Sequence, residues 1–245
     1  MRSPRSCRWH TRSIAAARLV AERQGRRREL SAVSALDGHP AASIGARGLT
    51  TRWATVILAV LIVGCRDRGS RESVVRDADG NTYSSKRMRD GRTWVTENLR
   101  PELPDSYCDD GMPSRCVQFG RLYTWASAAE ACRLLGAGWR LPTDDEWRQM
   151  ASGYGGVRGD SHDEGRSAYI ALLKGGDSGF DAVLGGDRES GGNYARVGDH
   201  GLYWTATESN EGHAWFYNFG RGGGLLNRHS EGDKSMAISV RCIGA

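Results

Sequence analysis

Residues 138–147 read GWRLPTDDEW, and in this stretch an irregular segment turns into a helix. Thr143 followed three residues later by Glu146 forms a capping box, in which each side chain accepts a hydrogen bond from the backbone N–H of the other residue. The box predicts a helix that begins after Thr143. Trp147 and Met150 fall on one side of that helix, so we expect both to face a core.

Further helices are predicted on both sides of this stretch. The segment 123–135 carries apolar or small residues at steps of three and four, namely Trp125, Ala128, Ala129, Cys132 and Leu135. Two nearby glycines end this helix, and its Cys132 is expected to point inward. Another helix is predicted over 167–174, where it stops before Gly175.

Strands punctuated by glycine follow the helices. They are predicted over 201–208, 213–219, 224–228 and 236–243. In the last of them Ile238, Val240 and Cys242 share one face by strict alternation. Upstream, a turn at 79–81 and a short strand at 93–95 precede the first helix. The predicted fold class is α+β, with helices first and then an antiparallel meander.

The length and charge of the chain limit which classes of protein it can belong to. The chain has 245 residues, of which 39% are hydrophobic and 33 are glycine, a composition that suits one domain of about 150 to 200 residues. The net charge of +5 comes from residues 1–64, where eleven arginines outweigh three acidic residues by +8, so the rest of the chain carries −3. The basicity belongs to the leader, and no nucleic-acid partner is expected for the domain.

The amino-terminal part of the chain has the features of an export signal. Arg47 and Arg52 precede an apolar stretch at 53–63 that is too short to span a bilayer, which needs about 20 apolar residues. The stretch runs into IVGC at 62–65, which is similar to a lipobox whose cysteine, here Cys65, is lipidated and becomes the mature amino terminus. An ordinary buried strand is the alternative, but the basic and polar flanks disfavour it.

This signal divides the chain into four parts. Residues 1–46 are expected to be a disordered or spurious extension, with a nucleic-acid arm as the alternative reading of their arginines. Residues 47–64 are the signal peptide, 65–76 a lipidated flexible tether, and 77–245 the domain. The predicted location is the cell envelope outside the cytoplasm, with the protein anchored by acyl chains to a bacterial membrane, at the outer membrane or the cell surface.

Four cysteines lie in the domain: Cys108, Cys116, Cys132 and Cys242. An even number in an exported domain indicates disulfides, for which three pairings exist. Cys108 and Cys116 flank a short polar loop, which favours a local bridge and leaves Cys132 for Cys242. A zinc site is the alternative, but neither a C-x-x-C pair nor a histidine at ligand spacing accompanies these cysteines.

Seven short segments follow one another in a distinctive order. They are DGNTY (79–83), WVTENL (94–99), FGRLYTW (119–125), GWRLPTDDEW (138–147), GFDAVLGG (179–186), YWTATE (203–208) and SVRCI (239–243). In this order they resemble the Fibrobacter succinogenes major paralogous domain family. One spacing departs from that family, because residues 133–137 separate Cys132 from Gly138, as in the related lectin-like carboxy-terminal domains of some bacterial adhesins.

The resemblance implies a disulfide-stapled domain related to the C-type lectin and formylglycine-generating-enzyme fold, also called the sulfatase-modifying-factor fold. It implies an exported or lipid-anchored bacterial protein with no catalytic activity and no cofactor. The enzymatic alternative is an oxygenase of the formylglycine-generating type, which needs free metal-binding thiols. The sequence GDSG at 176–179 resembles the nucleophile segment of serine proteases, but this chain cannot build the barrels that place the histidine and aspartate of such a triad.

A candidate ligand surface surrounds the hairpin predicted from 201–208 and 213–219. Aromatic and polar residues alternate there: Trp204, Glu208, Asn210, His213, Trp215, Tyr217, Asn218 and Arg221. Aromatic faces beside amide and carboxylate groups suit a sugar or a peptide. The alternative is that the two tryptophans are core and the polar residues merely solvated. No metal is assigned, because Glu208 and Asn210 alone do not make the oxygen cluster that calcium needs.

The functional hypothesis is therefore a non-catalytic, lectin-like domain for binding or adhesion, with membrane as one partner and a carbohydrate or protein as the other. A structural envelope protein without a small ligand is the first alternative. An enzyme of the formylglycine-generating type is the second. Bound carbohydrate would separate the hypothesis from the first alternative, and free thiols in the folded domain would favour the second.

Overall fold

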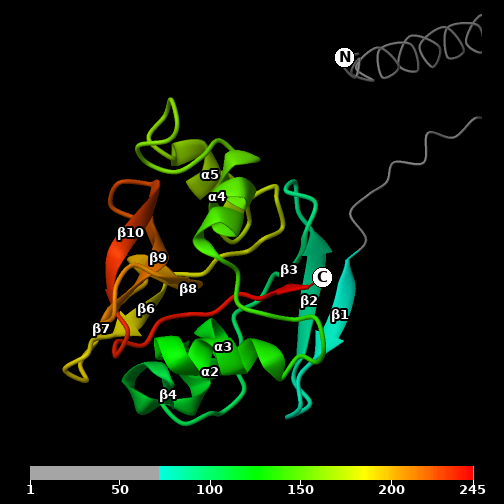
Figure 1. Ribbon diagram of the computed structural model, residues 1–245, viewed down its shortest axis with the longest axis vertical. Helices are drawn as coiled ribbons and strands as arrows, with labels where there is room; N and C mark the ends of the chain where they lie inside the picture. Colours follow the sequence, from blue (N-terminus) through cyan, green and yellow to red (C-terminus); the bar gives the residue numbers. More distant parts are fainter. Residues whose placement is uncertain (1–71, 245) are drawn as a thin grey trace, which may run out of the picture. The chain divides into compact units, whose positions relative to one another are not determined.

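A computed structural model describes residues 72–244, and Figure 1 shows how their helices and strands are arranged. The predicted extension at 1–46, the predicted signal peptide at 47–64 and the lipidation site Cys65 lie outside the described residues. Among the residues that are described, no helix is both long and apolar enough to cross a membrane.

The first sheet joins the two ends of the described chain. Its antiparallel strands are, in order, β1 (Ser73–Arg76), β2 (Thr82–Arg87), β3 (Thr93–Val95) and β11 (Ile243–Gly244). The predicted turn connects β1 to β2, and there Gly80 has a φ of +88°. The Asp77 carboxylate holds this turn by accepting hydrogen bonds from the Asn81 N–H (2.9 Å) and the Tyr83 hydroxyl (2.6 Å). Because β1 begins at Ser73, the folded domain includes the last residues of the predicted tether.

Helices occupy the middle of the described chain. They are η1 (Asp109–Gly111), α2 (Pro113–Phe119), α3 (Trp125–Arg133), α4 (Asp144–Ser152) and α5 (Arg166–Leu172), with the short strands β4 (Ser106–Tyr107) and β5 (Leu122–Tyr123) among them. Helices α3, α4 and α5 confirm the three that were predicted. Helix α2 was not predicted; it starts with Pro113 at its first turn, a position where proline's missing N–H costs nothing.

The capping box of α4 forms as predicted. The Thr143 hydroxyl accepts a hydrogen bond from the Glu146 N–H at 3.3 Å, and the Glu146 carboxylate accepts one from the Thr143 N–H at 2.8 Å. Glu146 also accepts two bonds from the Arg140 guanidinium, at 2.8 and 2.6 Å. These bonds from Arg140 outweigh burial and lower the pKa of Glu146 to about 2. Trp147 and Met150 are fully buried, as expected.

The second sheet has the strand order β10-β9-β8-β6-β7. Its strands are β6 (Gly185–Arg188), β7 (Tyr194–Val197), β8 (His200–Glu208), β9 (His213–Gly220) and β10 (Leu225–Asp233). Strands β8 to β10 form the predicted antiparallel meander, while β6 and β8 are parallel where Gly186 pairs with Gly201. The strand predicted at 93–95 is present as β3, but β1 and β2 were not predicted, so the expected order of helices first and strands afterwards is wrong. Strand β6 escaped prediction because its sequence, GGDR, contains none of the residues that favour strands.

The segment 236–243, predicted as one regular strand, is not one. It forms isolated bridges to a succession of partners, which are Arg188, Tyr123, Tyr203 and Arg140. Its alternating apolar residues are fully buried, as expected: Ile238, Val240 and Cys242. Ser239 and Arg241 between them are fully buried as well. The segment is packed on all sides, so the alternation in its sequence does not mark an exposed face.

Two clusters of buried side chains support the fold. One surrounds Trp147, which stacks on Tyr217 with ring centroids 5.0 Å apart and also contacts Phe180 and Tyr203 edge-on or tilted. The other surrounds Trp204 and includes Cys132 of α3. Strand β8 contributes to both clusters, because its successive residues point to opposite faces of the sheet.

Both predicted disulfides are present. Cys108 and Cys116 lie eight residues apart and have a Cα–Cα distance of 5.0 Å. Cys132 and Cys242 lie 110 residues apart, with a Cα–Cα distance of 5.6 Å. The second bridge fastens α3 to the residue just before β11, and so ties the helical part of the domain to its first sheet.

Candidate functional site

A fully buried guanidinium, that of Arg241, lies beside a hollow of about 400 Å³ that we call the arginine hollow. Arg241 Nε donates to the side-chain oxygen of Asn98 (2.7 Å), and its two terminal nitrogens donate to the carbonyl oxygens of Phe180 and Asp181 (2.7 Å each). The Asn98 amide in turn donates to the Phe119 carbonyl and to the Ser239 hydroxyl, at 2.8 and 3.0 Å. Five of the seven sequence segments described above meet here, since the Tyr203 ring also lies within 5.7 Å of the guanidinium.

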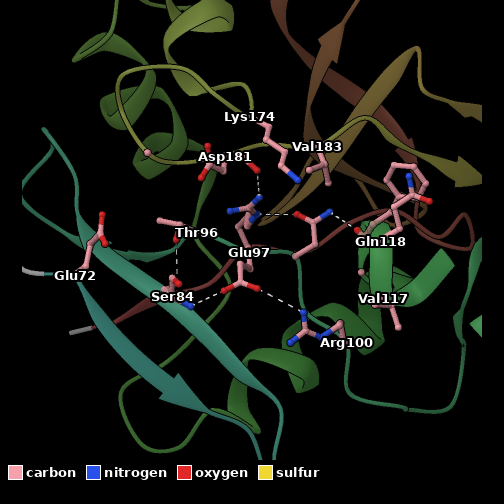
Figure 2. Close-up of a pocket in the computed structure, with 15 residues that line it drawn as sticks. Glu72, Ser84, Thr96, Glu97, Arg100, Val117, Gln118, Lys174, Asp181 and Val183 are labelled. Atoms are coloured by element: carbon pink, nitrogen blue, oxygen red, sulfur yellow. Dashed lines mark hydrogen bonds and ion pairs between the residues drawn. The ribbon is translucent and has the colours of Figure 1, made fainter. Parts of the chain in front are cut away.

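Most polar groups around the arginine hollow form hydrogen bonds with one another. Figure 2 shows the Glu97 side chain between Ser84 and Arg100, with Lys174 entering from the opposite side. Glu97 accepts a hydrogen bond from the Ser84 N–H at 2.8 Å and one from Arg100 at 3.5 Å. Asp181 accepts one from a backbone N–H of the turn after α5, at 3.1 Å. Burial lowers the pKa of the Arg241 guanidinium, and neutral oxygens satisfy it. The arginine hollow is thus the structural junction of the domain.

A second hollow, of about 470 Å³, opens over one face of the second sheet, and we call it the acidic cleft. Its lining comes from β6 to β10 and the loops beside them: Asp187, Glu189, Ser190, Gly191, Arg196, His200, Leu202, Phe216, Asn218, His229, Glu231, Asp233 and Met236. Phe216 is its aromatic floor, and the His229 ring stacks on it with centroids 4.9 Å apart and planes 14° apart. The acidic cleft therefore combines an apolar floor with a strongly charged rim.

Carboxylates outnumber cations around the acidic cleft. Asp187, Glu189, Glu231 and Asp233 face one guanidinium, that of Arg196. Arg196 forms ion pairs with both Asp187 and Glu189. The Asp187 side chain is only 2% exposed, and its Oδ1 accepts no hydrogen bond within residues 72–244. Burial raises the pKa of Asp187, and the bond from Arg196 offsets this only in part.

Two histidines complete the rim of the acidic cleft. His200 Nδ1 lies 3.0 Å from the Asn218 side-chain oxygen. His229 Nδ1 lies 2.9 Å from a carboxylate oxygen of Glu231. These contacts orient both rings through Nδ1, and Nε2 of each ring takes no part in them. Burial raises the pKa of Glu231, but the hydrogen bond and charge of His229 and the bonds from backbone N–H groups together outweigh burial, so the pKa lies below its ordinary value.

The structure does not bring the eight residues of the predicted ligand surface together. Trp204 and Tyr217 are fully buried and belong to the two cores, which removes them from the surface. Trp204 Nε1 donates to the Tyr123 carbonyl at 2.8 Å, and the Tyr217 hydroxyl donates to the Asp144 carbonyl at 3.1 Å. For Trp204, the core alternative weighed in the sequence analysis holds.

The other six residues of that surface lie in three places. Glu208, Asn210, His213 and Trp215 line a shallow hollow at the turn between β8 and β9, and this hollow shares Glu231 with the acidic cleft. Asn218 lines the acidic cleft itself. Arg221 follows the far end of β9 and donates its backbone N–H to the Asp199 carbonyl at 2.9 Å.

Most of the acidic cleft was missed by the sequence analysis. The signal for part of it lay in residues 229–233, HSEGD, which continue β10 well past its predicted end at 228. A shift of register between His229 and Gly232 breaks the simple alternation there, which hides the strand in the sequence. Asp187 and Arg196 gave no such signal, because they meet only through the pairing of β6 with β7.

The described residues contain no group of three or more histidine, cysteine, aspartate or glutamate side chains placed to hold a metal ion. The four domain cysteines are paired as disulfides, so they offer no thiolate ligands. Within residues 72–244 the acidic cleft thus presents four carboxylates, two histidines and one arginine, with neither a cluster of metal ligands nor a free thiol.

These observations define a disulfide-stapled α+β domain in which five of the seven signature segments meet at one buried arginine. Residues 79–244 match the model of the Fibrobacter succinogenes major domain, and the chain belongs to that family. The match spans all seven segments on which the resemblance was based, and so confirms it. No curated protein and no solved structure matches the chain significantly.

Proposed function

We propose that this chain is an exported, lipid-anchored protein that carries its family domain outside the cytoplasm as a non-catalytic binding module. The apolar stretch at 53–63 followed by Cys65 supports export and lipidation. The two disulfides support the same location, because such bonds persist in oxidising compartments. A lectin-like relation of the fold is part of the proposal and rests on the order of the seven sequence segments.

The observation that carries the binding function is the acidic cleft. The acidic cleft is an open hollow with an aromatic floor and an excess of carboxylates. Repulsion between these like charges destabilises the folded domain unless a ligand compensates for it. Aromatic and apolar floors with a few convergent polar groups are typical of ligand sites. A structural envelope protein without a ligand has no use for this arrangement.

The enzyme alternative finds little support. An oxygenase of the formylglycine-generating type needs free thiols, and here Cys108, Cys116, Cys132 and Cys242 are bonded in pairs. The carbohydrate or protein ligand is therefore proposed to be bound and released without reaction.

The test is a screen of the membrane-extracted protein against arrays of glycans and of peptides, with cleft variants in parallel. We expect one ligand class to bind, and the double variant Glu189→Gln/Glu231→Gln to weaken binding by about tenfold or more, because a lost charged contact of about 1.4 kcal/mol changes affinity tenfold. The matched control Glu102→Gln/Glu130→Gln makes the same change of charge away from the cleft. Equal binding by both double variants would refute the assignment to the acidic cleft.

A further inference from the structure

The rim of the acidic cleft is short of positive charge. Arg196 is the one guanidinium in a lining with four carboxylates, and it is shared between Asp187 and Glu189. Glu231 contacts His229, and Asp233 accepts hydrogen bonds from the N–H and hydroxyl of Ser235 at 2.8 and 2.7 Å. None of these partners of Glu231 and Asp233 is a permanent cation.

Asp187 is the carboxylate whose position most needs explanation. Its side chain is 98% removed from solvent, it lines the acidic cleft, and its Oδ1 has no hydrogen-bond partner among the described residues. A buried carboxylate oxygen without a donor is a costly state that proteins seldom leave uncompensated. A ligand that brings both a donor and a positive charge would relieve it.

The floor beneath these carboxylates is apolar. Leu202, Phe216 and Met236 form it, and His229 covers part of the Phe216 ring. A ligand that fits must therefore present a hydrocarbon stem to the floor and a compact charged head to the rim. An alkyl chain ending in an ammonium group has this form, with three donors for several carboxylates.

We propose that the acidic cleft binds a lysine-type alkylammonium group of a peptide, with the ammonium held by Asp187 and Glu189 and the alkyl stem lying over Phe216. This proposal rests on the binding function proposed above and names its ligand class. A divalent metal fits less well, because the described residues form no cluster of three ligands placed around one point. An anionic ligand is disfavoured, because the excess of carboxylates in the acidic cleft repels negative charge.

The test is a titration of the full, membrane-extracted protein with Nα-acetyl-lysine N-methylamide, followed by NMR of the histidine ring protons. The same titration is run with the Nε-acetylated form, which keeps the stem and loses the charge, and with glucosamine, which keeps the charge and loses the stem. Saturable shifts of His200 and His229 are expected with the lysine amide alone. Binding should weaken as ionic strength rises from 0.1 M toward 1 M, since the Debye length falls from about 10 Å to about 3 Å.

Variants assign the contact to residues. Asp187→Asn and Glu189→Gln are each expected to weaken binding of the lysine amide by about tenfold, because each variant removes one charged hydrogen bond to the ammonium. Glu189 is partly exposed, so its variant tests the proposal even where Asp187→Asn fails to fold. The control Glu102→Gln/Glu130→Gln should leave binding unchanged.

The outcomes separate this proposal from the broader one. Equal binding of the lysine amide and its Nε-acetylated form would overturn the ammonium assignment, as would a preference for glucosamine. A neutral glycan or peptide that binds at the acidic cleft, with no binding of the lysine amide, would also overturn it while leaving the binding function standing. An unchanged dissociation constant for the lysine amide in Glu189→Gln would contradict the placement of the ammonium.

Discussion

Arg241 is a charged side chain buried among neutral partners. Its donors reach carbonyl oxygens of Phe180 and Asp181 and the amide of Asn98, from segments 60 or more residues away in the chain. Arginine suits this position because its planar fork offers several donors in fixed directions. Lysine at the same place concentrates its three donors on one nitrogen, which matches three oxygens in different directions less well than the arginine fork.

Replacing Arg241 with methionine is expected to destabilise the domain by about 3 kcal/mol or more, because several buried oxygens lose their donors at once. Arg241→Lys should recover only part of this loss. Urea unfolding followed by tryptophan fluorescence measures both effects. Lys174→Ala, at the exposed side of the same hollow, is the control and should change stability by less than about 0.5 kcal/mol. A similar loss in the Lys174 and Arg241 variants would contradict the assigned role.

Glu146 gives the domain a specific dependence on pH. Its pKa is lowered from an ordinary value of 4.5 to about 2, first by the hydrogen bonds from Arg140. A carboxyl group whose pKa is lower in the folded state stabilises it above the unfolded pKa, and this contribution disappears as the pH falls toward the folded pKa. The stability that Glu146 supplies, at most about 3 kcal/mol, should thus be lost between pH 4.5 and pH 2.

The measurement is the free energy of unfolding of the native protein and of Glu146→Gln from pH 7 to pH 2. The difference between them should be constant above pH 5 and shrink toward zero at pH 2. Glu130→Gln, which removes an exposed partner of Arg133, should follow the native curve. A constant difference down to pH 2 would show that the pKa of Glu146 is not lowered.

At the scale of elements, the two disulfides constrain the chain very differently. Cys108–Cys116 closes a loop of eight residues that contains η1 and the first part of α2, whereas Cys132–Cys242 closes one of 110 residues and joins α3 to the end of the domain. The chain-entropy model assigns about 2.5 kcal/mol to the short loop and about 4.8 kcal/mol to the long one. The long bridge is the greater constraint on the unfolded chain.

Replacing Cys132 and Cys242 together by alanine is therefore expected to lower the free energy of unfolding more than replacing Cys108 and Cys116. The difference should be about 2 kcal/mol from chain entropy alone. Denaturant unfolding of the two double variants without reductant gives the comparison. A larger loss from the Cys108/Cys116 pair would mean that local packing, not loop closure, governs the stability of this fold.

Local signals predicted some elements well and others poorly. The capping box and helical spacing located α3 and α4, because caps and periodicity act within one or two turns of the chain. The strand expected at 236–243 is instead irregular, because its partners come from distant segments. Strand β6 has no local signature and exists through its pairing with β7 and β8.

Which side chains reach solvent depends on how the whole domain packs. The predicted ligand surface grouped Tyr217 with Asn218, but these neighbours in β9 point to opposite faces of the sheet, Tyr217 to the core of Trp147 and Asn218 to the acidic cleft. The sequence of β9 does not decide which of its two faces is buried. That choice depends on which side of the second sheet the helices cover. For the same reason the acidic cleft, assembled from five strands, was largely beyond prediction from sequence, while both disulfide pairings followed from simple spacing.

The central claim is an exported, lipid-anchored protein whose domain is held by two disulfides. Intact mass, with and without reduction, tests it on protein expressed with its own leader in a bacterial host and recovered from the membrane fraction. We predict a mature chain that begins at acylated Cys65 and gains two hydrogens for each of its two disulfides on reduction. An unprocessed cytoplasmic chain with free thiols would contradict the claim and reopen the metal and enzyme hypotheses.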